Sequence, residues 1–263
     1  MSPQKIDPTA ILGQGVVLGE GTIIGPYAVI EDGAVLGSHC HIQSHVVIKK
    51  HAVLGNGVEV GHFSVIGGDP QHLSFDRSLA SFAEVGSGTR IGEGVTIHRS
   101  YEEGGLTRVG DNCFLMGNSH IAHDCELGDN TILANGALLG GHVEVGDRVF
   151  VGGGAAVHQF VRIGTGVMVG GLAEISVDVP PCLLISGRNQ SSGLNRIGLS
   201  RNKISQESIA ELKKLYLELI KNYGSPAKRA AEIMASGEYS SAEAKDFLSF
   251  LLMEKRRYVR HRS

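Results

Sequence analysis

The 263-residue sequence contains no tryptophan, and aromatic residues make up only 5% of it. A chain of this length has ample material for a core, which must here be built from aliphatic side chains and regular turns. No apolar run approaches the roughly 20 residues that a membrane-spanning helix needs. We therefore expect no membrane span and a cytoplasmic protein.

Cysteine is also scarce, with four residues in the chain: Cys40, Cys113, Cys125 and Cys182. None of them forms a CxxC pair or has the spacing of metal ligands. Free thiols in a reducing compartment are the simplest interpretation. The cysteines therefore point to neither a disulfide framework nor a metal centre.

Charge is distributed unevenly along the chain. Residues 1–195 carry 10 Lys or Arg and 19 Asp or Glu, which gives −9, whereas residues 196–263 carry 14 and 8, which gives +6. The two parts sum to the net charge of −3. A basic carboxyl-terminal part suits an acidic partner or ligand, although a solvated helical surface would give the same count. We expect no nucleic-acid partner.

Glycine is abundant, at 37 residues, and it belongs to an internal repeat. Aliphatic residues recur every six positions, and a small or β-branched residue stands four places after each of them. The series begins with Leu12, Leu18, Ile24, Ile30, Leu36, Ile42, Ile48, Leu54, Val60 and Ile66. A helix needs a period of 3.6 and an ordinary strand a period of 2. Period six predicts a short strand and a tight turn in each repeat.

Three such strands close a triangular coil of about 18 residues, and successive coils stack about 4.8 Å apart. This pattern resembles the hexapeptide-repeat transferases. The resemblance implies a left-handed coil, against the usual right-handed crossover. We therefore predict an all-β, left-handed parallel β-helix with a small carboxyl-terminal α-helical domain.

Interruptions of the rhythm set the expected domain boundaries. The β-helix is predicted over residues 1–181, with loops leaving the coil near 68–84 and 99–108. Loops of this size in a regular solenoid are often functional. Pro180 and Pro181 end the rhythm, so we predict a linker over 182–204 and a helical domain over 205–263.

Histidines gather between Leu115 and Phe160. The four histidines of this stretch fall outside the two inward positions of the hexad, and so does the earlier His98; the four are His120, His123, His142 and His158. His123, Gly141 and Gln159 are 18 residues apart, so we expect them to stack on one edge of successive coils. The neighbouring His142 and His158 would then lie within about 10 Å of His123.

A histidine cluster of this kind suits acid–base chemistry. An imidazole titrates near pH 7, and the adjacent Asp124 is placed to orient the His123 ring. Gly140 and Gly141 leave backbone N–H groups open to a developing oxyanion. Clustered histidines also bind metals, and His120 with His123 would supply two ligands, as in a zinc hydrase of the γ-carbonic-anhydrase type.

Several motifs together resemble the UDP-N-acetylglucosamine acyltransferases of lipid A synthesis, over nearly the whole chain. They include GLTRVGDNCFLMGNSHIAHDC, ILANGALLGGHV, AVHQF, MVGG and DVPP. The resemblance implies transfer of a 3-hydroxyacyl chain from acyl carrier protein to the 3-position of UDP-N-acetylglucosamine, the first step of lipid A biosynthesis. It also implies a homotrimer with the cleft between subunits, and no metal or free cofactor. The acidic carrier protein would suit the basic carboxyl-terminal part.

The same resemblance implies roles for individual residues. His123 matches the general base, Asp124 its orienting acid and Gly141 the oxyanion donor. Positions that line the sugar and acyl cleft are His98, His120, His142, His158 and Gln159, while Asn195 and Arg201 match nucleotide contacts and Gly171 a position that limits acyl length.

Four residues depart from the family pattern. The family motif PQDLK reads PQHLS here, so His72 and Ser74 replace a carboxylate and an amine that contact the substrate. Ile197 stands in place of an acid and Asn202 in place of an arginine. These departures leave a 3-amino UDP-sugar, which would give an amide, as an alternative acceptor.

Overall fold

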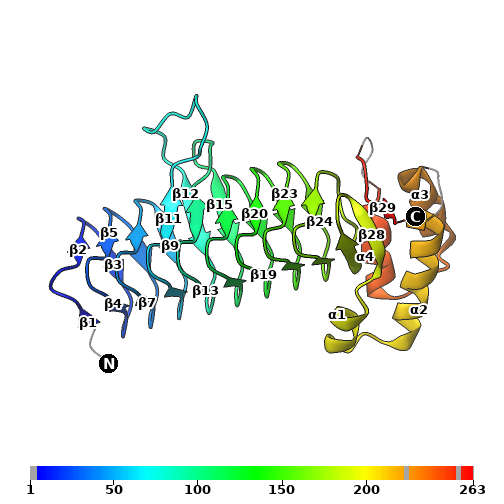
Figure 1. The fold of residues 1–263 in the computed structure, drawn as a ribbon, viewed down its shortest axis with the longest axis horizontal. Helices are drawn as coiled ribbons and strands as arrows, with labels where there is room; N and C mark the ends of the chain where they lie inside the picture. Colours follow the sequence, from blue (N-terminus) through cyan, green and yellow to red (C-terminus); the bar gives the residue numbers. More distant parts are fainter. Residues whose placement is uncertain (1–4, 222–224, 253–255, 263) are drawn as a thin grey trace.

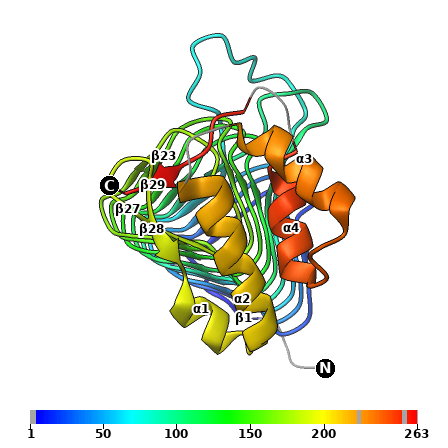
Figure 2. The same ribbon diagram turned by 90° about the vertical axis from the view of Figure 1, so that its right-hand side faces the viewer.

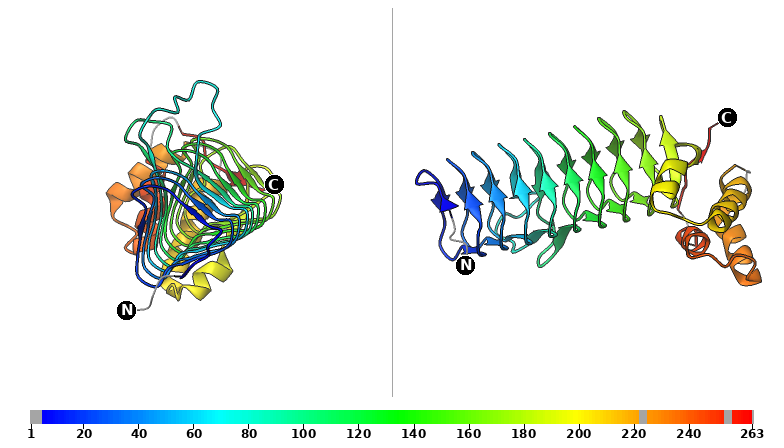
Figure 3. Two further views of the ribbon diagram at one scale, coloured as in Figure 1. Left: turned by 90° about the vertical axis from the view of Figure 1, so that its left-hand side faces the viewer. Right: turned by 90° about the horizontal axis from the view of Figure 1, so that it is seen from below.

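A computed structural model describes residues 5–221, 225–252 and 256–262. Most of its strands are two residues long and are separated by tight turns. They form three sheets of 12, 9 and 8 strands, in which each strand of the coil pairs in parallel with the third strand before it and the third after it. The three sheets are the faces of a long triangular coil, which is seen end-on in Figures 2 and 3 and from the side in Figure 1.

The strands divide among the sheets as follows. The 12-stranded sheet contains β1 (Lys5–Ile6), β4 (Ile23–Ile24), β7 (His41–Ile42), β10 (Glu59–Val60), β13 (Arg90–Ile91), β16 (Phe114–Leu115), β19 (Ile132–Leu133), β22 (Phe150–Val151), β25 (Met168–Val169), β27 (Leu183–Ser186), β28 (Gln190–Leu194) and β29 (Arg260–His261). The nine-stranded sheet contains β2 (Ile11–Leu12), β5 (Val29–Ile30), β8 (Val47–Ile48), β11 (Val65–Gly68), β14 (Thr96–His98), β17 (His120–Ile121), β20 (Leu138–Leu139), β23 (Ala156–Val157) and β26 (Glu174–Ile175). The eight-stranded sheet contains β3 (Val17–Leu18), β6 (Val35–Leu36), β9 (Ala52–Leu54), β12 (Phe82–Val85), β15 (Leu106–Val109), β18 (Glu126–Leu127), β21 (Glu144–Val145) and β24 (Arg162–Ile163).

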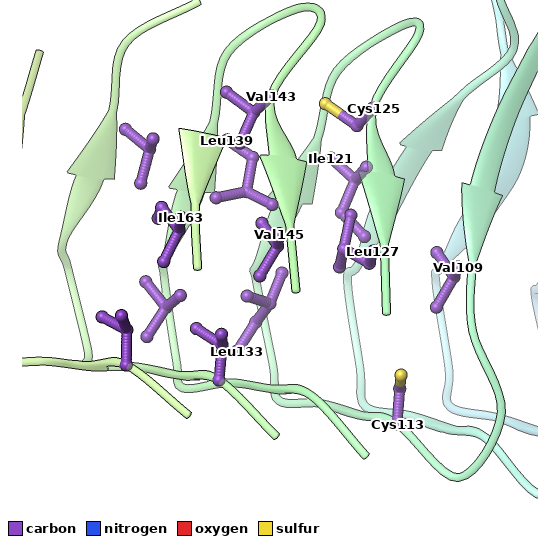
Figure 4. Close-up of a cluster of buried hydrophobic side chains, with 14 of the residues drawn as sticks. Val109, Cys113, Ile121, Cys125, Leu127, Leu133, Leu139, Val143, Val145 and Ile163 are labelled. Atoms are coloured by element: carbon purple, nitrogen blue, oxygen red, sulfur yellow. The ribbon is translucent and has the colours of Figure 1, made fainter. Parts of the chain in front are cut away.

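The aliphatic residues of the repeat fill the interior of the coil. Ile121, Leu133 and Leu139 have no exposed surface, and Figure 4 shows them pointing inward. The small residues four places on, such as Cys125 and Val143, also point inward and complete each layer. Because every coil repeats this pattern, the hydrophobic effect fixes which residues remain outside on the edges.

Two loops leave the coil on the same side, where they project upward in Figure 1. The first, residues 69–81, joins β11 to β12, and the second, residues 99–105, joins β14 to β15. Arg99 anchors the first loop from the base of the second. Its buried guanidinium donates to Asp69 Oδ1 at 3.0 Å and to the Arg77 carbonyl at 3.1 Å, and it stacks over the Phe75 ring.

The segment expected as a linker is folded. The coil continues past the two prolines into β27, because Leu183 and Ile185 are again buried in its interior. β28 then turns back antiparallel to β27 and leads into α1 (Arg196–Arg201). Regular structure therefore spans most of residues 182–204, in place of the predicted linker.

The helical part covers one end of the coil, as Figure 2 shows. It consists of α2 (Gln206–Leu215), its continuation η1 (Tyr216–Lys221), α3 (Pro226–Ser236) and α4 (Ala242–Phe250). The Ser205 hydroxyl caps α2 by accepting from the Ser208 N–H at 3.1 Å. The basic end of the chain returns to pair β29 in parallel with β28. Among the described residues, no helix is long and apolar enough to cross a membrane.

Candidate active site

The histidine stretch lies on one edge of the coil, directly after three strands of the nine-stranded sheet. His120 in β17 pairs with Leu138 in β20, which pairs with Ala156 in β23. The turns that follow are joined by backbone hydrogen bonds, from His142 N–H to the His123 carbonyl at 3.0 Å and from Phe160 N–H to the Gly141 carbonyl at 2.9 Å. His123, Gly141 and Gln159 therefore stack on one edge, as their spacing predicts.

His123 and Asp124 form a hydrogen-bonded pair at the centre of this edge. His123 Nδ1 lies 2.7 Å from Asp124 Oδ2, and both side chains are largely buried. Adjacent residues of a strand point to opposite faces, but Asp124 occupies a turn with φ of 59°. This left-handed conformation brings the two side chains to the same side.

The second loop and the start of β15 hold Asp124 in place. Its carboxylate accepts from the Ser100 hydroxyl and from the Tyr101 N–H at 3.0 Å, and its own N–H donates to Thr107 Oγ1 at 2.7 Å. Burial would raise the pKa of Asp124, but hydrogen bonds from His123, Ser100 and Tyr101 outweigh it and lower the pKa. Asp124 is therefore a carboxylate at neutral pH.

A row of rings crosses the edge at this pair. His72 meets Tyr101 with ring centroids 4.8 Å apart, and Tyr101 meets His123 at 5.7 Å. On the other side, His142 packs edge-on against His123 at 5.2 Å and stacks on Phe160 at 4.6 Å. The first loop thus brings His72 near His123 from 51 positions earlier in the chain. Ser74 lies beside His72, to whose Nδ1 its N–H donates at 3.2 Å.

Gly141 leaves room for the His123 ring. A Cβ on Gly141 would lie 2.8 Å from His123 Cε1 and 2.9 Å from Nε2, which no real contact allows. Its N–H donates to no atom of the described residues, whereas the equivalent N–H of Gln14 donates to Asp32 Oδ1 at 2.8 Å. Gln159 follows Gly141 by 18 residues, just as Asp32 follows Gln14. Within the part of the chain described here, the Gln159 side chain accepts no hydrogen bond from the Gly141 N–H.

His98 at the end of β14 and His120 in β17 form a second pair, with ring centroids 4.8 Å apart. Although His98 points out of the coil, it is buried beside Gly68 at the base of the first loop. Burial, followed by the nearby His120 and His123, lowers the pKa of His98 to about 4, and burial also lowers that of His120. Both rings are therefore neutral at pH 7, and His120 Nδ1 pairs with Thr96 Oγ1 at 2.7 Å.

His158 precedes Gln159 on this edge and is exposed, with its Nδ1 3.2 Å from the Gln159 carbonyl. Other expected site residues lie elsewhere. Gly171 follows β25 of another sheet, on the edge that also carries Gly153. Asn195 caps α1, and both ends of its amide are bonded within the chain, to Gly166 and Gly198.

Three further residues belong to α1 and its end. Ile197 and Arg201 are exposed on α1, and Asn202 caps its carboxyl end. Within one chain, this helix lies at the far end of the coil from the two loops, as Figure 1 shows. Gly171, Asn195 and Arg201 are therefore not brought to His123 by this chain alone.

The structure also changes the set of possible metal ligands. His123, Asp124 and His142 offer ligand atoms within 4.8 Å of one another among the described residues, whereas His120 is not part of this group. The pair His120 and His123, which the sequence suggested, stays a prediction, and the structure adds a different group around His123. Asp124 already accepts three hydrogen bonds from protein groups, and this favours proton transfer over metal binding.

The sequence did not single out Ser100, Tyr101, Thr107 or Phe160. A signal exists for Phe160, which is 18 residues after His142 and must stack on it. For Ser100, the signal is hidden by the second loop, which lengthens that coil. Ile97 pairs with Ile121, 24 residues later, and the same offset aligns Ser100 with Asp124.

Comparisons with known proteins match both the repeat and the carboxyl-terminal part of the chain. The profile described as "Bacterial transferase hexapeptide (six repeats)" matches residues 15–50 and 106–141, and that described as "Udp N-acetylglucosamine O-acyltransferase; Domain 2" matches residues 178–259. An acyl-[acyl-carrier-protein]–UDP-N-acetylglucosamine O-acyltransferase of Campylobacter lari is 37% identical over 96% of this chain and 95% of its own length. The enzyme of the same name from Aquifex aeolicus is 52% identical over 75% of this chain and 76% of its own.

Among solved structures, the UDP-N-acetylglucosamine acyltransferase from Campylobacter jejuni superimposes with a TM-score of 0.91 at 33% identity, covering 98% of this chain and 100% of the other. This similarity confirms the predicted left-handed parallel β-helix with a helical carboxyl-terminal part. The chain belongs to the family of acyl-[acyl-carrier-protein]–UDP-N-acetylglucosamine O-acyltransferases.

Proposed function

We propose that this protein transfers a 3-hydroxyacyl chain from acyl carrier protein to the 3-hydroxyl of UDP-N-acetylglucosamine, with His123 as the general base. The observation that carries the proposal is the 2.7 Å contact between His123 Nδ1 and Asp124 Oδ2. A carboxylate at this position keeps the proton on Nδ1. Nε2 is then the free base, and it lies on the side of the ring where Gly141 has no side chain.

The reaction requires one proton to be moved twice. Nε2 takes the proton of the sugar hydroxyl as its oxygen attacks the thioester carbonyl, and the negative charge that forms on the carbonyl oxygen is stabilised by the Gly141 N–H. Collapse of the intermediate breaks the carbon–sulfur bond. The imidazolium returns its proton to the sulfur, so the products are a sugar ester and the free thiol of the carrier protein.

We propose that the other binding residues act across a homotrimer interface. Gly171, Asn195 and Arg201 lie away from His123 within one chain, so a second subunit must supply them if they meet the same substrate. Gly171 is exposed, and no atom lies closer than 3.4 Å to the place of a Cβ, which leaves space for a long acyl chain. His98, His120, His142, His158 and Gln159 would then line the cleft from the first subunit.

The carrier protein would approach from the basic end of the chain. Arg256 Nη1 donates to the Phe160 carbonyl at 2.9 Å, so the returning carboxyl-terminal segment reaches the same edge as His142. The segment 256–262 contains four arginines. Positive charge beside the cleft would attract an acidic protein and speed its encounter.

The test is to incubate the purified protein with UDP-N-acetylglucosamine, or its 3-amino analogue, and a ladder of 3-hydroxyacyl carrier proteins, and to weigh the products. We expect the mass of one ester on UDP-N-acetylglucosamine, with one acyl length preferred. Exclusive acylation of the amino analogue would instead assign an amide-forming activity, which His72 and Ser74 in the first loop leave open. Stoichiometric zinc in the purified protein, without acyl transfer, would support the hydrase.

A further inference from the structure

The carboxylate of Asp124 has more hydrogen-bond donors than the pairing with His123 requires. Oδ2 receives His123 Nδ1 at 2.7 Å and the Tyr101 N–H at 3.0 Å. Oδ1 receives the Ser100 hydroxyl in a short contact. Two of the three donors therefore come from the second loop, where Ser100 stands 24 residues before Asp124, and this loop is absent from the regular repeat.

The geometry around Ser100 fixes the direction of its hydroxyl proton. The ionised Asp124 carboxylate can only accept, so the Ser100 hydroxyl donates to it, and the alternative acceptor, the Glu102 carbonyl, is farther away at 3.5 Å. The Ser100 oxygen in turn accepts from the Glu102 N–H at 3.0 Å. Ser100 has no exposed surface. A Cβ on Gly105 would lie 2.1 Å from the Ser100 oxygen, so the loop closes tightly over this hydroxyl only because residue 105 is glycine.

We infer that Ser100 is a positioning residue for acyl transfer, which acts through Asp124 on His123. This inference rests on the proposed role of His123. With Ser100 on Oδ1 and Tyr101 on Oδ2, the carboxylate cannot turn about its Cβ–Cγ bond without losing charge-assisted hydrogen bonds. Oδ2 stays on His123 Nδ1, which keeps Nε2 unprotonated and aimed at the acceptor hydroxyl.

The test is the Ser100→Ala variant, assayed as the full-length protein with both substrates. Removing one hydrogen bond to a charged group should lower kcat about tenfold and change KM for either substrate by less than about threefold. Asp124 loses a donor, so its pKa rises and the low-pH limb of kcat/KM moves to higher pH. Ser100→Cys has a similar side-chain volume, but its thiol is a weak hydrogen-bond donor, so it should show the same changes. This second variant keeps the test valid if Ser100→Ala does not fold.

Ser64→Ala is the matched control, because Ser64 is also buried and also makes two hydrogen bonds, to Gly92 and Val95, away from this cluster. It should leave kcat and the pH profile unchanged. In an Asp124→Ala background, Ser100→Ala should cost almost nothing further, since it acts only through Asp124. Full additivity, or an unchanged kcat in Ser100→Ala, overturns the inference. If His123→Ala retains turnover, the proposed function fails instead.

Discussion

His123 and Asp124 are consecutive residues whose side chains meet, with Nδ1 2.7 Å from Oδ2. The left-handed turn at Asp124 makes this possible, because it folds the carboxylate back toward the preceding ring. Positive φ recurs at every sixth residue from Asn112 to Phe160, so each corner of this part of the coil has such a turn. The repeat therefore offers ready positions for a two-residue acid–base pair, and the chemistry depends on which residues occupy them.

Gly141 is the first residue to test beside this pair. Gly141→Ala would place a methyl group 2.8 Å from His123 Cε1, so the ring must move away from its present position. We expect kcat to fall at least about tenfold, because general-base catalysis needs the base within hydrogen-bond reach of the hydroxyl. Steady-state kinetics measures this. A variant with wild-type kcat would show that the position of the His123 ring is unimportant.

His98 should make the stability of the protein depend on pH. Burial, then the neighbouring His120 and His123, holds its pKa at about 4, below the value of about 6.5 expected after unfolding. The unfolded chain therefore binds more protons between these values, and the free energy of unfolding falls as pH decreases from about 6.5 to about 4, by roughly 3 kcal/mol from this residue.

The measurement is urea unfolding at a series of pH values for the wild type and His98→Gln. We expect the variant to lose part of the decrease in this window. The exposed His41, replaced in the same way, is the control. Identical pH dependence in the wild type and His98→Gln would contradict the argument.

Arg99 and Arg77 offer a matched comparison, because both contact Asp69. Arg99 is buried and donates from Nε at 3.0 Å, while Arg77 is exposed, with its Nε at 3.5 Å. Arg99→Ala should destabilise the protein by about 3 kcal/mol, at the low end for a broken buried pair because Asp69 is partly exposed. Arg77→Ala should cost less than about 1 kcal/mol.

The Arg99→Ala and Arg77→Ala variants should also differ in how firmly the first loop is held against the coil. Without Arg99, residues 69–81 lose their anchor to the coil, so limited proteolysis should cut within them faster than in the wild type. Because this loop carries His72, KM for the sugar nucleotide should also rise. Equal proteolysis of the Arg99→Ala and Arg77→Ala variants would exclude Arg99 as the anchor.

The loop residues that depart from the family pattern can be reversed. The double variant His72→Asp and Ser74→Lys restores the charges of the PQDLK motif. If the acceptor is UDP-N-acetylglucosamine, kcat/KM for that substrate should increase. The wild type and the double variant should each be assayed with UDP-N-acetylglucosamine and with its 3-amino analogue, which gives the preference of each protein between the two acceptors. A decrease for UDP-N-acetylglucosamine would assign these two positions to a different acceptor.

The sequence predicts the coil and the stacked edge well, for a physical reason. A period of six places every aliphatic residue inside, so the register of each turn follows from counting, and His123, Gly141 and Gln159 align without further information. The two loops break the count. Their lengths change the offset between coils, and so the contacts of Arg99 with Asp69 and of Ser100 with Asp124 appear only in three dimensions.

Two other features also depend on more than periodicity. Burial of His98 results from the base of the first loop covering an outward position, which a hexad count assigns to the surface. The segment after the prolines looks polar, yet Leu183 and Ile185 extend the core by one more strand. Gly171, Asn195 and Arg201 are grouped with His123 only by resemblance, because one chain places them on other parts of the fold.

The central claim is that His123 acts as the general base for acyl transfer to UDP-N-acetylglucosamine. The most direct measurement is kcat of His123→Ala with saturating 3-hydroxyacyl carrier protein and UDP-N-acetylglucosamine, beside an exposed-histidine control, His41→Ala. We predict a fall of about 10²–10⁴-fold for His123→Ala and none for His41→Ala. Turnover of His123→Ala within a few-fold of the wild type would contradict the account.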